Sequence, residues 1–240
     1  MKREILTIEQ NHSLTKDVFE MRLSGDVSAI TKPGQFVNIA LDGLFLRRPI
    51  SVCDWSENSL TIIYKVVGKG TEQMSRMNAG EKLDVLVGLG NGFDPEICPE
   101  NPSLIGGGVG VPPMYGLAKR LIAMGKKPVA ILGFNKEEEI FYADEFAKLG
   151  IETIITTVDG SVGVKGFVTN AMAENAYVCC CGPAPMLKAV YAKAGDGQFS
   201  FEERMGCGFG ACMGCTCKTK YGNKRICKDG PVLMKEEIVW

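Results

Sequence analysis

Four cysteines near the C-terminal end of the chain stand at a spacing that suits an iron–sulfur cluster. Four residues separate Cys207 from Cys212, two separate Cys212 from Cys215, and eleven separate Cys215 from Cys227. The C-x4-C-x2-C…C spacing is that of plant-type [2Fe–2S] sites, where four thiolates hold two irons. Glycines among these cysteines let the backbone approach sulfur and aim its N–H groups at it. The sequence therefore predicts a [2Fe–2S] cluster on Cys207, Cys212, Cys215 and Cys227.

Two alternatives compete for the same residues. The pair Cys212-x2-Cys215 alone would suit zinc, and buried thiols that bind nothing are also conceivable. Cys217 can replace Cys215 in a different pairing, but the spacing fits better without it, and we expect Cys217 not to be a ligand. The N-terminus has no apolar block of the kind a signal peptide carries, which favours a reducing compartment and metal binding over disulfides for the ten cysteines.

Composition excludes several classes of function. The 240 residues are 45% hydrophobic and 23% charged, as in ordinary globular proteins. A net charge of −1 gives no strong attraction to nucleic acid or to an anionic membrane. No apolar run approaches the roughly 20 residues that a membrane-spanning helix needs. We expect a cytoplasmic protein that binds neither nucleic acid nor membrane.

Strand patterns dominate the first part of the chain, residues 1–98. Short segments rich in β-branched and apolar residues are separated by Gly, Pro, Asn and Asp, which predicts a small antiparallel barrel. The segments are REILTIE, VFEMRL, QFVNIAL, LTIIYKVV and KLDVLVGL. His12 is expected in a polar, solvated turn.

Strands and helices alternate from about residue 102 to residue 195, which predicts a parallel, doubly wound sheet with helices on both faces. In this part EEEIFYADEFAKLG is expected to form one amphipathic helix, and GFVTNAMAEN to begin another. Residues 198–240 follow neither pattern. They are too few and too polar for a core of their own, so we expect a metal or a partner to hold them.

Two glycine-containing turns follow apolar strands in this second part. GGGVGVPP, residues 106–113, precedes a helix, where free N–H groups and the helix dipole favour phosphate. From Gly108 the pattern is G-x-G-x-x-P rather than G-x-G-x-x-G, and a plain tight turn is the alternative. CGPAPML, residues 181–187, lies at the carboxyl end of another strand, where open α/β sheets bind ligands. We expect Cys181 to line this site, and Cys179 and Cys180 to be core residues.

The first part contains FLRRPISV, which places Arg48 and Ser51 near a strand. A guanidinium suits phosphate, and a hydroxyl can bind a ring nitrogen; a surface arginine is the alternative. Gly70 and Thr71 are expected in a flexible turn with free N–H groups.

With these motifs in this order, the chain resembles the ferredoxin reductase superfamily and, within it, the electron-transfer subunits of NAD-dependent dihydroorotate dehydrogenase B. The resemblance covers essentially the whole chain, and ERMGCGFGACMGC…CKDGPV is its most specific part. It implies a FAD-binding barrel (1–98), a NAD-binding α/β domain (99–197) and a [2Fe–2S] segment (198–240). The superfamily favours Arg-x-Tyr-Ser at the flavin motif, whereas Ile50 stands here in the third position, which leaves open what packs on the flavin ring.

The resemblance also implies binding residues. Arg48 would contact the FAD phosphates, Ser51 would lie near the flavin, and Gly70 and Thr71 would contact the pyrophosphate. The other FAD contacts would be Pro49, Ile50, Ile63, Tyr64 and Lys65. The NAD site would be formed by Gly107, Gly108, Gly110, Gly182, Pro183 and Met186. The four cysteines would ligate the cluster.

The implied activity needs a second subunit. In this family an FMN-containing catalytic subunit oxidises dihydroorotate to orotate in pyrimidine biosynthesis, and a heterotetramer with two copies of each subunit is expected. Electrons cross the [2Fe–2S] cluster singly, collect on FAD and leave as a hydride to NAD+, so no acid–base catalytic residue is implied in this chain. The acidic NKEEEI segment favours NAD over NADP, although Lys136 weakens that preference. The alternatives are a reductase subunit of a hydrogenase, sulfide dehydrogenase or ferredoxin–NADP oxidoreductase, and a zinc-stabilised nucleotide-binding module.

Overall fold

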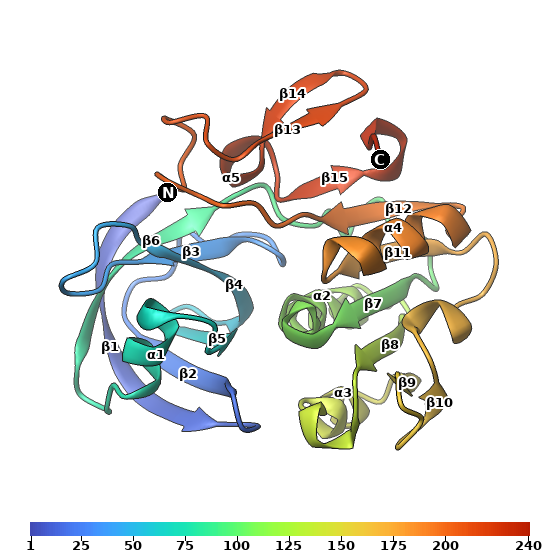
Figure 1. Ribbon diagram of the computed structural model, residues 1–240, viewed down its shortest axis with the longest axis horizontal. Helices are drawn as coiled ribbons and strands as arrows, with labels where there is room; N and C mark the ends of the chain where they lie inside the picture. Colours follow the sequence, from blue (N-terminus) through green and yellow to red (C-terminus); the bar gives the residue numbers. More distant parts are fainter.

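The computed structural model describes residues 1–240, and its first part is a closed barrel of six antiparallel strands in the order β1-β2-β5-β4-β3-β6 (Figure 1). These strands are β1 (Lys2–Ser13), β2 (Val18–Ser24), β3 (Phe36–Ile39), β4 (Arg48–Trp55), β5 (Ser59–Lys65) and β6 (Lys82–Leu89). In β6 every second residue is buried, from Leu83 to Leu89, so one face of the strand fills the barrel. The sequence-based prediction of an antiparallel barrel is confirmed.

One short helix, α1 (Lys69–Ser75), follows β5, with Gly68 as its N-cap. The expectation of a flexible turn at Gly70 and Thr71 was wrong, because both residues lie in the first turn of this helix. The Thr71 hydroxyl explains the difference: it accepts hydrogen bonds from the N–H groups of Val67 at 2.9 Å and Gly68 at 3.3 Å and so fixes the start of the helix. The first N–H groups of any helix lack intrahelical partners, so donors remain free at this end.

The second part is a seven-stranded sheet in the order β10-β9-β8-β7-β11-β12-β15. All neighbouring strands are parallel except the last pair, β12 and β15. The strands are β7 (Ser103–Gly107), β8 (Val129–Phe134), β9 (Thr153–Thr157), β10 (Val164–Lys165), β11 (Tyr177–Cys181), β12 (Asp196–Ser200) and β15 (Val232–Met234). The predicted parallel sheet is confirmed.

Helices cover both faces of this sheet. One apolar core joins α2 (Val111–Ala123) and α3 (Ala143–Lys148) to the face that carries Leu104 and Cys179. A second core joins α4 (Ala184–Lys193) to the opposite face, which carries Cys180. Cys179 and Cys180 are completely buried, as expected for core residues. None of the five α-helices has the length and apolar character required to cross a bilayer.

Two expected helices are shorter than the sequence pattern suggested. Residues 137–150 form a 3-10 turn, η2 (Glu137–Glu139), and then α3, because Tyr142 adopts a left-handed backbone conformation (φ +65°) that no continuous helix allows. The segment after Gly166 forms only η3 (Val168–Asn170). The Asn170 side chain accepts a hydrogen bond from the Phe167 N–H and so competes with further helix formation.

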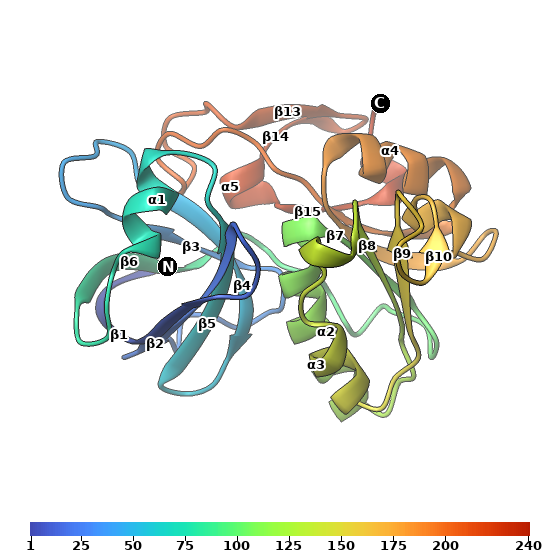
Figure 2. The ribbon, with the colours of Figure 1, turned by 60° about the horizontal axis from the view of Figure 1, so that its bottom comes forward.

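The C-terminal segment lies across one side of the molecule and meets both the barrel and the sheet (Figures 1 and 2). It contains the hairpin β13 (Thr216–Thr219) and β14 (Gly222–Arg225), then α5 (Ile226–Asp229) and, after β15, η4 (Lys235–Glu237). β15 adds to the sheet beside β12, and the expected boundary between residues 197 and 198 falls inside β12. The segment is therefore anchored on the sheet and its apolar core as well as by any metal it binds.

Two apolar clusters contain residues of both the barrel and the sheet. Val18, Cys53 and Ile63 of the barrel are buried together with residues of α2 and β7. Helix α2 approaches β4 so closely that a Cβ on Gly116 would lie 2.6 Å from the Cys53 carbonyl oxygen. A glycine at this position is what allows the helix to lie against the barrel wall.

Candidate functional site

The four predicted cluster ligands lie in two pairs. In the first pair, the Cys207 N–H donates to the Cys212 Sγ and the Cys212 N–H donates to the Cys207 Sγ, both at 3.4 Å. In the second pair, the Cys227 N–H donates to the Cys215 Sγ at 3.4 Å. No three of the chain's His, Cys, Asp and Glu side chains converge on the position of a single metal ion. Two pairs of thiols match a two-iron cluster, because the four thiolates are shared between two metals.

The backbone around the first pair favours thiolate. Burial opposes ionisation of Cys207, but N–H groups of Cys212, Phe209 and Ala211 lower the pKa of its thiol to about 6. The Ala211 N–H lies 3.2 Å from the Cys207 Sγ. Burial and the neighbouring Cys215 thiol raise the pKa of Cys227 to about 12. Because iron binds thiolate, cluster assembly must remove the proton of each thiol. Loss of the proton costs more free energy at Cys227, whose pKa is raised, than at Cys207, whose pKa is lowered.

The cluster loop is held against the barrel by Asn38 of β3. Its side-chain amide donates to the Cys207 carbonyl oxygen at 3.2 Å. Gly208 has φ +79°, and a Cβ there would lie 2.2 Å from the Asn38 amide nitrogen. The two cysteine pairs differ in solvent exposure: Cys212 of the first pair is exposed, whereas Cys215 and Cys227 of the second pair are buried. Cys217 is half-buried on β13, and its role as a non-ligand stays a prediction.

A cavity of about 380 Å³ lies between the barrel and the sheet. It brings together most of the residues that the sequence assigned to FAD, from β4, β5 and the start of α1. Gly70 does not line it, but Gly70 packs against Arg48, where a Cβ would lie 2.1 Å from the Arg48 Nε. The predicted FAD residues that line the cavity are Arg48, Pro49, Ile50, Ser51, Ile63, Tyr64, Lys65 and Thr71.

Half of the residues that line the cavity were not predicted from the sequence. The end of β12 and the residues that follow it fold back over the cavity, and they bring two carboxylates, Glu202 and Glu203. Burial raises the pKa of Glu202. The ERMGC motif predicts a cluster ligand and carries the family resemblance, but no spacing rule connects it to the flavin motif. The unpredicted lining residues are Phe36, Val67, Val109, Ser200, Phe201, Glu202, Glu203, Met205 and Pro231.

The residues predicted for NAD meet at the carboxyl ends of β7 and β11, which are neighbouring parallel strands. Met186 contacts both ends: a Cβ on Gly107 would lie 2.4 Å from its Sδ, and one on Gly182 would lie 2.4 Å from its Cε. Gly110 approaches the Cys181 carbonyl oxygen, where a Cβ would lie 2.1 Å away.

The other predicted NAD residues, Gly108 and Pro183, belong to the same two turns. Cys181, which we expected to line the site at this edge of the sheet, lines the cavity that contains the predicted FAD residues and so connects the two.

The carboxyl end of β8 bears on the choice of dinucleotide. Lys136 forms an ion pair with Glu138, and Glu137 and Glu139 complete an acidic 3-10 turn. Three glutamates therefore lie beside one lysine at this edge, and the excess of negative charge is unfavourable for a 2′-phosphate, although the exposed Lys136–Glu138 pair itself is weak.

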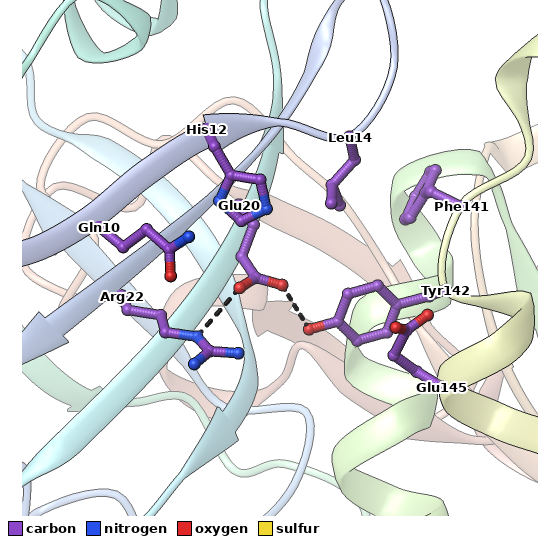
Figure 3. Close-up of a pocket in the computed structure, with 8 residues that line it drawn as sticks. All are labelled: Gln10, His12, Leu14, Glu20, Arg22, Phe141, Tyr142 and Glu145. Carbon is purple, nitrogen blue, oxygen red and sulfur yellow. Dashed lines mark hydrogen bonds and ion pairs between the residues drawn. The ribbon is translucent and has the colours of Figure 1, made fainter. Parts of the chain in front are cut away.

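His12 does not lie in a solvated turn, and that prediction was wrong. Strand β1 continues to Ser13 and pairs His12 with Glu20 of β2. The imidazole is half-buried, and its Nδ1 is buried without a hydrogen-bond partner. It borders a second cavity, of about 360 Å³, between the barrel and the start of α3 (Figure 3).

The structure combines a closed antiparallel barrel with a parallel nucleotide-binding sheet. A cavity lies between them, and a cysteine loop lies close to that cavity. These features define a ferredoxin reductase-like oxidoreductase with an iron–sulfur segment. Family models agree. The model of the oxidoreductase NAD-binding domain matches residues 104–192, and the model of the iron–sulfur cluster binding domain of dihydroorotate dehydrogenase B matches residues 202–239.

Full-length relatives define the family. The chain is 47% identical to the dihydroorotate dehydrogenase B (NAD(+)) electron transfer subunit of Fusobacterium nucleatum, with 99% of each chain covered. It is 42% identical to that of Bacillus pumilus, over 99% of this chain and 98% of the relative. The chain belongs to the family of dihydroorotate dehydrogenase B electron transfer subunits.

Solved structures agree with this fold. The structure of the NADH-dependent reduced ferredoxin–NADP oxidoreductase, studied for flavin-based electron bifurcation, matches with a TM-score of 0.88 and 30% identity, over 99% of this chain and 90% of that chain. A ferredoxin NADP+ reductase from Neisseria gonorrhoeae shares the fold at a TM-score of 0.68 and 17% identity, over 80% of this chain and 90% of that chain.

Proposed function

We propose that this chain is the electron-transfer subunit of an NAD-dependent dihydroorotate dehydrogenase in pyrimidine biosynthesis. It carries electrons from an FMN-containing catalytic subunit to NAD+, with FAD and a [2Fe–2S] cluster as its cofactors. One observation carries the proposal: the cluster loop and the FAD cavity are one continuous structure, since Met205 lines the cavity and Cys207 follows two residues later. When bound, the cluster handles single electrons, and FAD converts them into a hydride.

The chain's own residues position these groups. Arg48 lies against the first turn of α1, so its guanidinium, which also donates to the Leu46 carbonyl oxygen, and the N–H groups near Gly70 and Thr71 would together contact the FAD pyrophosphate. Ile50 and Ser51 lie further along β4 and line the same cavity, where they would face the flavin ring. Three aromatic residues line the cavity, and Phe36, Tyr64 or Phe201 would supply the ring that packs on the flavin in place of the superfamily tyrosine.

The nicotinamide would enter from the carboxyl edge of the sheet. The glycines that end β7 and follow β11 leave backbone N–H groups and space for a dinucleotide, and Met186 holds the two turns together. Cys181 lies where this edge meets the FAD cavity. The site would thereby bring nicotinamide to the flavin in a cavity of which half of the lining residues are hydrophobic, and these would limit the access of water to the reacting atoms.

The catalytic subunit would dock on the exposed side of the cluster loop. Cys212 is exposed there, and Phe209 and Met213, which flank it in sequence, are 44% and 54% exposed. Exposed apolar side chains beside a redox centre suit a partner that must come close for single-electron transfer. We further propose two copies of each subunit and a cytoplasmic location, in keeping with the chain's unpaired thiols.

Reconstitution with the catalytic subunit tests the proposal. Prepared without air, each chain should contain two irons, two sulfides and one FAD, and the complex should reduce NAD+ when supplied with dihydroorotate. Molecular hydrogen, sulfide and reduced ferredoxin serve as alternative donors, each for one competing assignment. NAD+ reduction with one of these donors but not with dihydroorotate would overturn the proposed function, and zinc in place of iron would favour a nucleotide-binding module.

A further inference from the structure

A buried hydrogen bond connects the barrel to the nucleotide-binding part of the chain beside the second cavity, which lies where these two parts meet (Figure 3). Glu20 of β2 is only 5% exposed, although it is a carboxylate. One of its oxygens accepts a hydrogen bond from the Tyr142 hydroxyl at 2.8 Å, and the other accepts one from the Arg22 Nε at 3.0 Å. A buried carboxylate is retained only where its hydrogen-bond partners are held in place.

Tyr142 is held in an unusual conformation to make this contact. Its φ of +65° is uncommon for a bulky side chain, and such a conformation persists only where the surrounding structure enforces it. Its ring packs edge-to-face on Tyr115 of α2, with ring centroids 5.2 Å apart. The strained backbone therefore places one ring against α2 while its hydroxyl reaches into the barrel wall.

Glu20 and Tyr142 each contact or pair with a residue close to the proposed reaction site. Glu20 pairs with Ile63 on the neighbouring strand β5, and Ile63 lines the FAD cavity. Tyr115 lies in the second turn of α2, whose first residues follow the glycine turn proposed for NAD. Across the same seam Lys119 and Asp54 form an ion pair on the surface, where solvent makes such pairs weak. The buried hydrogen bond is thus the stronger polar restraint on the angle between the two parts.

We propose that Tyr142 is a positioning residue for hydride transfer. Its hydrogen bond to Glu20 fixes the nucleotide-binding sheet against the barrel and so sets the approach of nicotinamide to the flavin. The inference rests on the proposed function, because it needs FAD in one part and NAD in the other. Small errors in such an approach have large kinetic effects: a misplacement of about 1 Å can slow a reaction about a hundredfold.

The test is Tyr142→Phe in the assembled complex, since phenylalanine keeps the ring and removes only the hydroxyl. FAD reduction by NADH, followed by stopped-flow absorbance, should become about tenfold slower at saturating NADH. The Kd for NADH should stay within about twofold, and the long-wavelength charge-transfer absorbance of NADH against flavin should weaken. Glu20→Gln, which keeps an acceptor for the hydroxyl, should restore most of the rate relative to Glu20→Leu. Tyr115→Phe is the matched control in the same aromatic cluster and should leave the rate unchanged.

Three outcomes separate the possibilities. A Tyr142→Phe complex that melts earlier but reduces FAD at the normal rate would show a merely structural role and overturn the proposal. So would a weaker Kd for NADH with an unchanged rate at saturation. A wild-type complex that binds FAD but is not reduced by NADH would instead contradict the proposed function. In that case faster amide exchange in β2 and α3 of the variant would still support the restraint, and unchanged exchange would contradict it.

Discussion

The four thiols proposed as cluster ligands differ in what surrounds them. Cys212 is exposed and its sulfur accepts one hydrogen bond from the loop backbone, whereas the half-buried Cys207 sulfur accepts two. Substitution of one ligand should therefore remove the cluster without disturbing the FAD cavity, which is built mostly from other segments.

We expect Cys212→Ser to abolish the visible absorption of the cluster and dihydroorotate-dependent reduction of NAD+. Reduction of FAD by NADH should persist, because this step does not pass through the cluster. Spectra and stopped-flow traces of the purified complex check both expectations. Cys217→Ser is the matched control and should retain the cluster. A full cluster spectrum in Cys212→Ser would show that the ligand assignment is wrong.

In the cluster-free chain, the thiol of Cys207 should ionise at a lower pH than an ordinary cysteine. Its pKa is lowered to about 6 despite burial, so the thiolate predominates above that pH and the thiol below it. Alkylation by iodoacetamide at Cys207 should thus rise to half of its maximum near pH 6, against about 8.5 for an ordinary cysteine. Mass spectrometry of the labelled peptide gives the profile. A midpoint above about pH 8 would contradict the role of the backbone N–H groups.

Among the secondary-structure elements, α2 does most to join the two parts. Its first turn follows the glycine turn proposed for NAD, and its side lies on β4, which carries the FAD motif. The contact depends on Gly116, the one position where a side chain would collide with the Cys53 carbonyl oxygen.

Gly116→Ala should destabilise the protein by about 1–3 kcal/mol, because a methyl group is forced into a filled seam. Helix propensity alone predicts the opposite sign, a gain of about 1 kcal/mol. Denaturant unfolding measures the difference. Gly68→Ala is a suitable control, since Gly68 has extended backbone and open space around it, and its cost should stay below about 1 kcal/mol. A Gly116→Ala protein that is more stable than the wild type would contradict the close approach of α2.

The elements also show why periodicity misled in places. The segment around residues 137–150 has the composition of a helix, yet Tyr142 turns the chain into the left-handed region there. The hydrogen bond from Tyr142 to Glu20 and its ring contact with Tyr115 favour that break, and both partners are distant in sequence. Local propensity cannot anticipate a conformation that long-range contacts stabilise.

On the scale of the whole molecule, the C-terminal segment connects the cysteine loop, where electrons are proposed to enter, with the FAD cavity, where they are proposed to leave for NAD+. Its first residues wall the FAD cavity, its loop carries the thiol pairs, and β15 returns to the sheet. The exposed side chains of that loop face the position proposed for the catalytic subunit.

Phe209→Asp should therefore weaken association with the catalytic subunit by about tenfold or more, because a charge replaces an apolar contact at the centre of the proposed interface. The iron and FAD content of the isolated chain should stay unchanged. Titration by size-exclusion chromatography or calorimetry measures the affinity. Phe167→Asp, at a residue that is 64% exposed on the sheet side, is the matched control and should bind normally. Equal affinities of the two variants would place the catalytic subunit elsewhere.

The sequence alone was sufficient for the features that depend on local spacing. The order of barrel, sheet and cysteine segment, the turns after β7 and β11, and the four cysteines can be predicted because backbone geometry and ligand spacing act over a few residues. The far wall of the FAD cavity, the place of β15 in the sheet and the Tyr142–Glu20 contact could not be predicted in this way. They join residues separated by more than 30 positions, and only the packing of the folded chain brings such residues together.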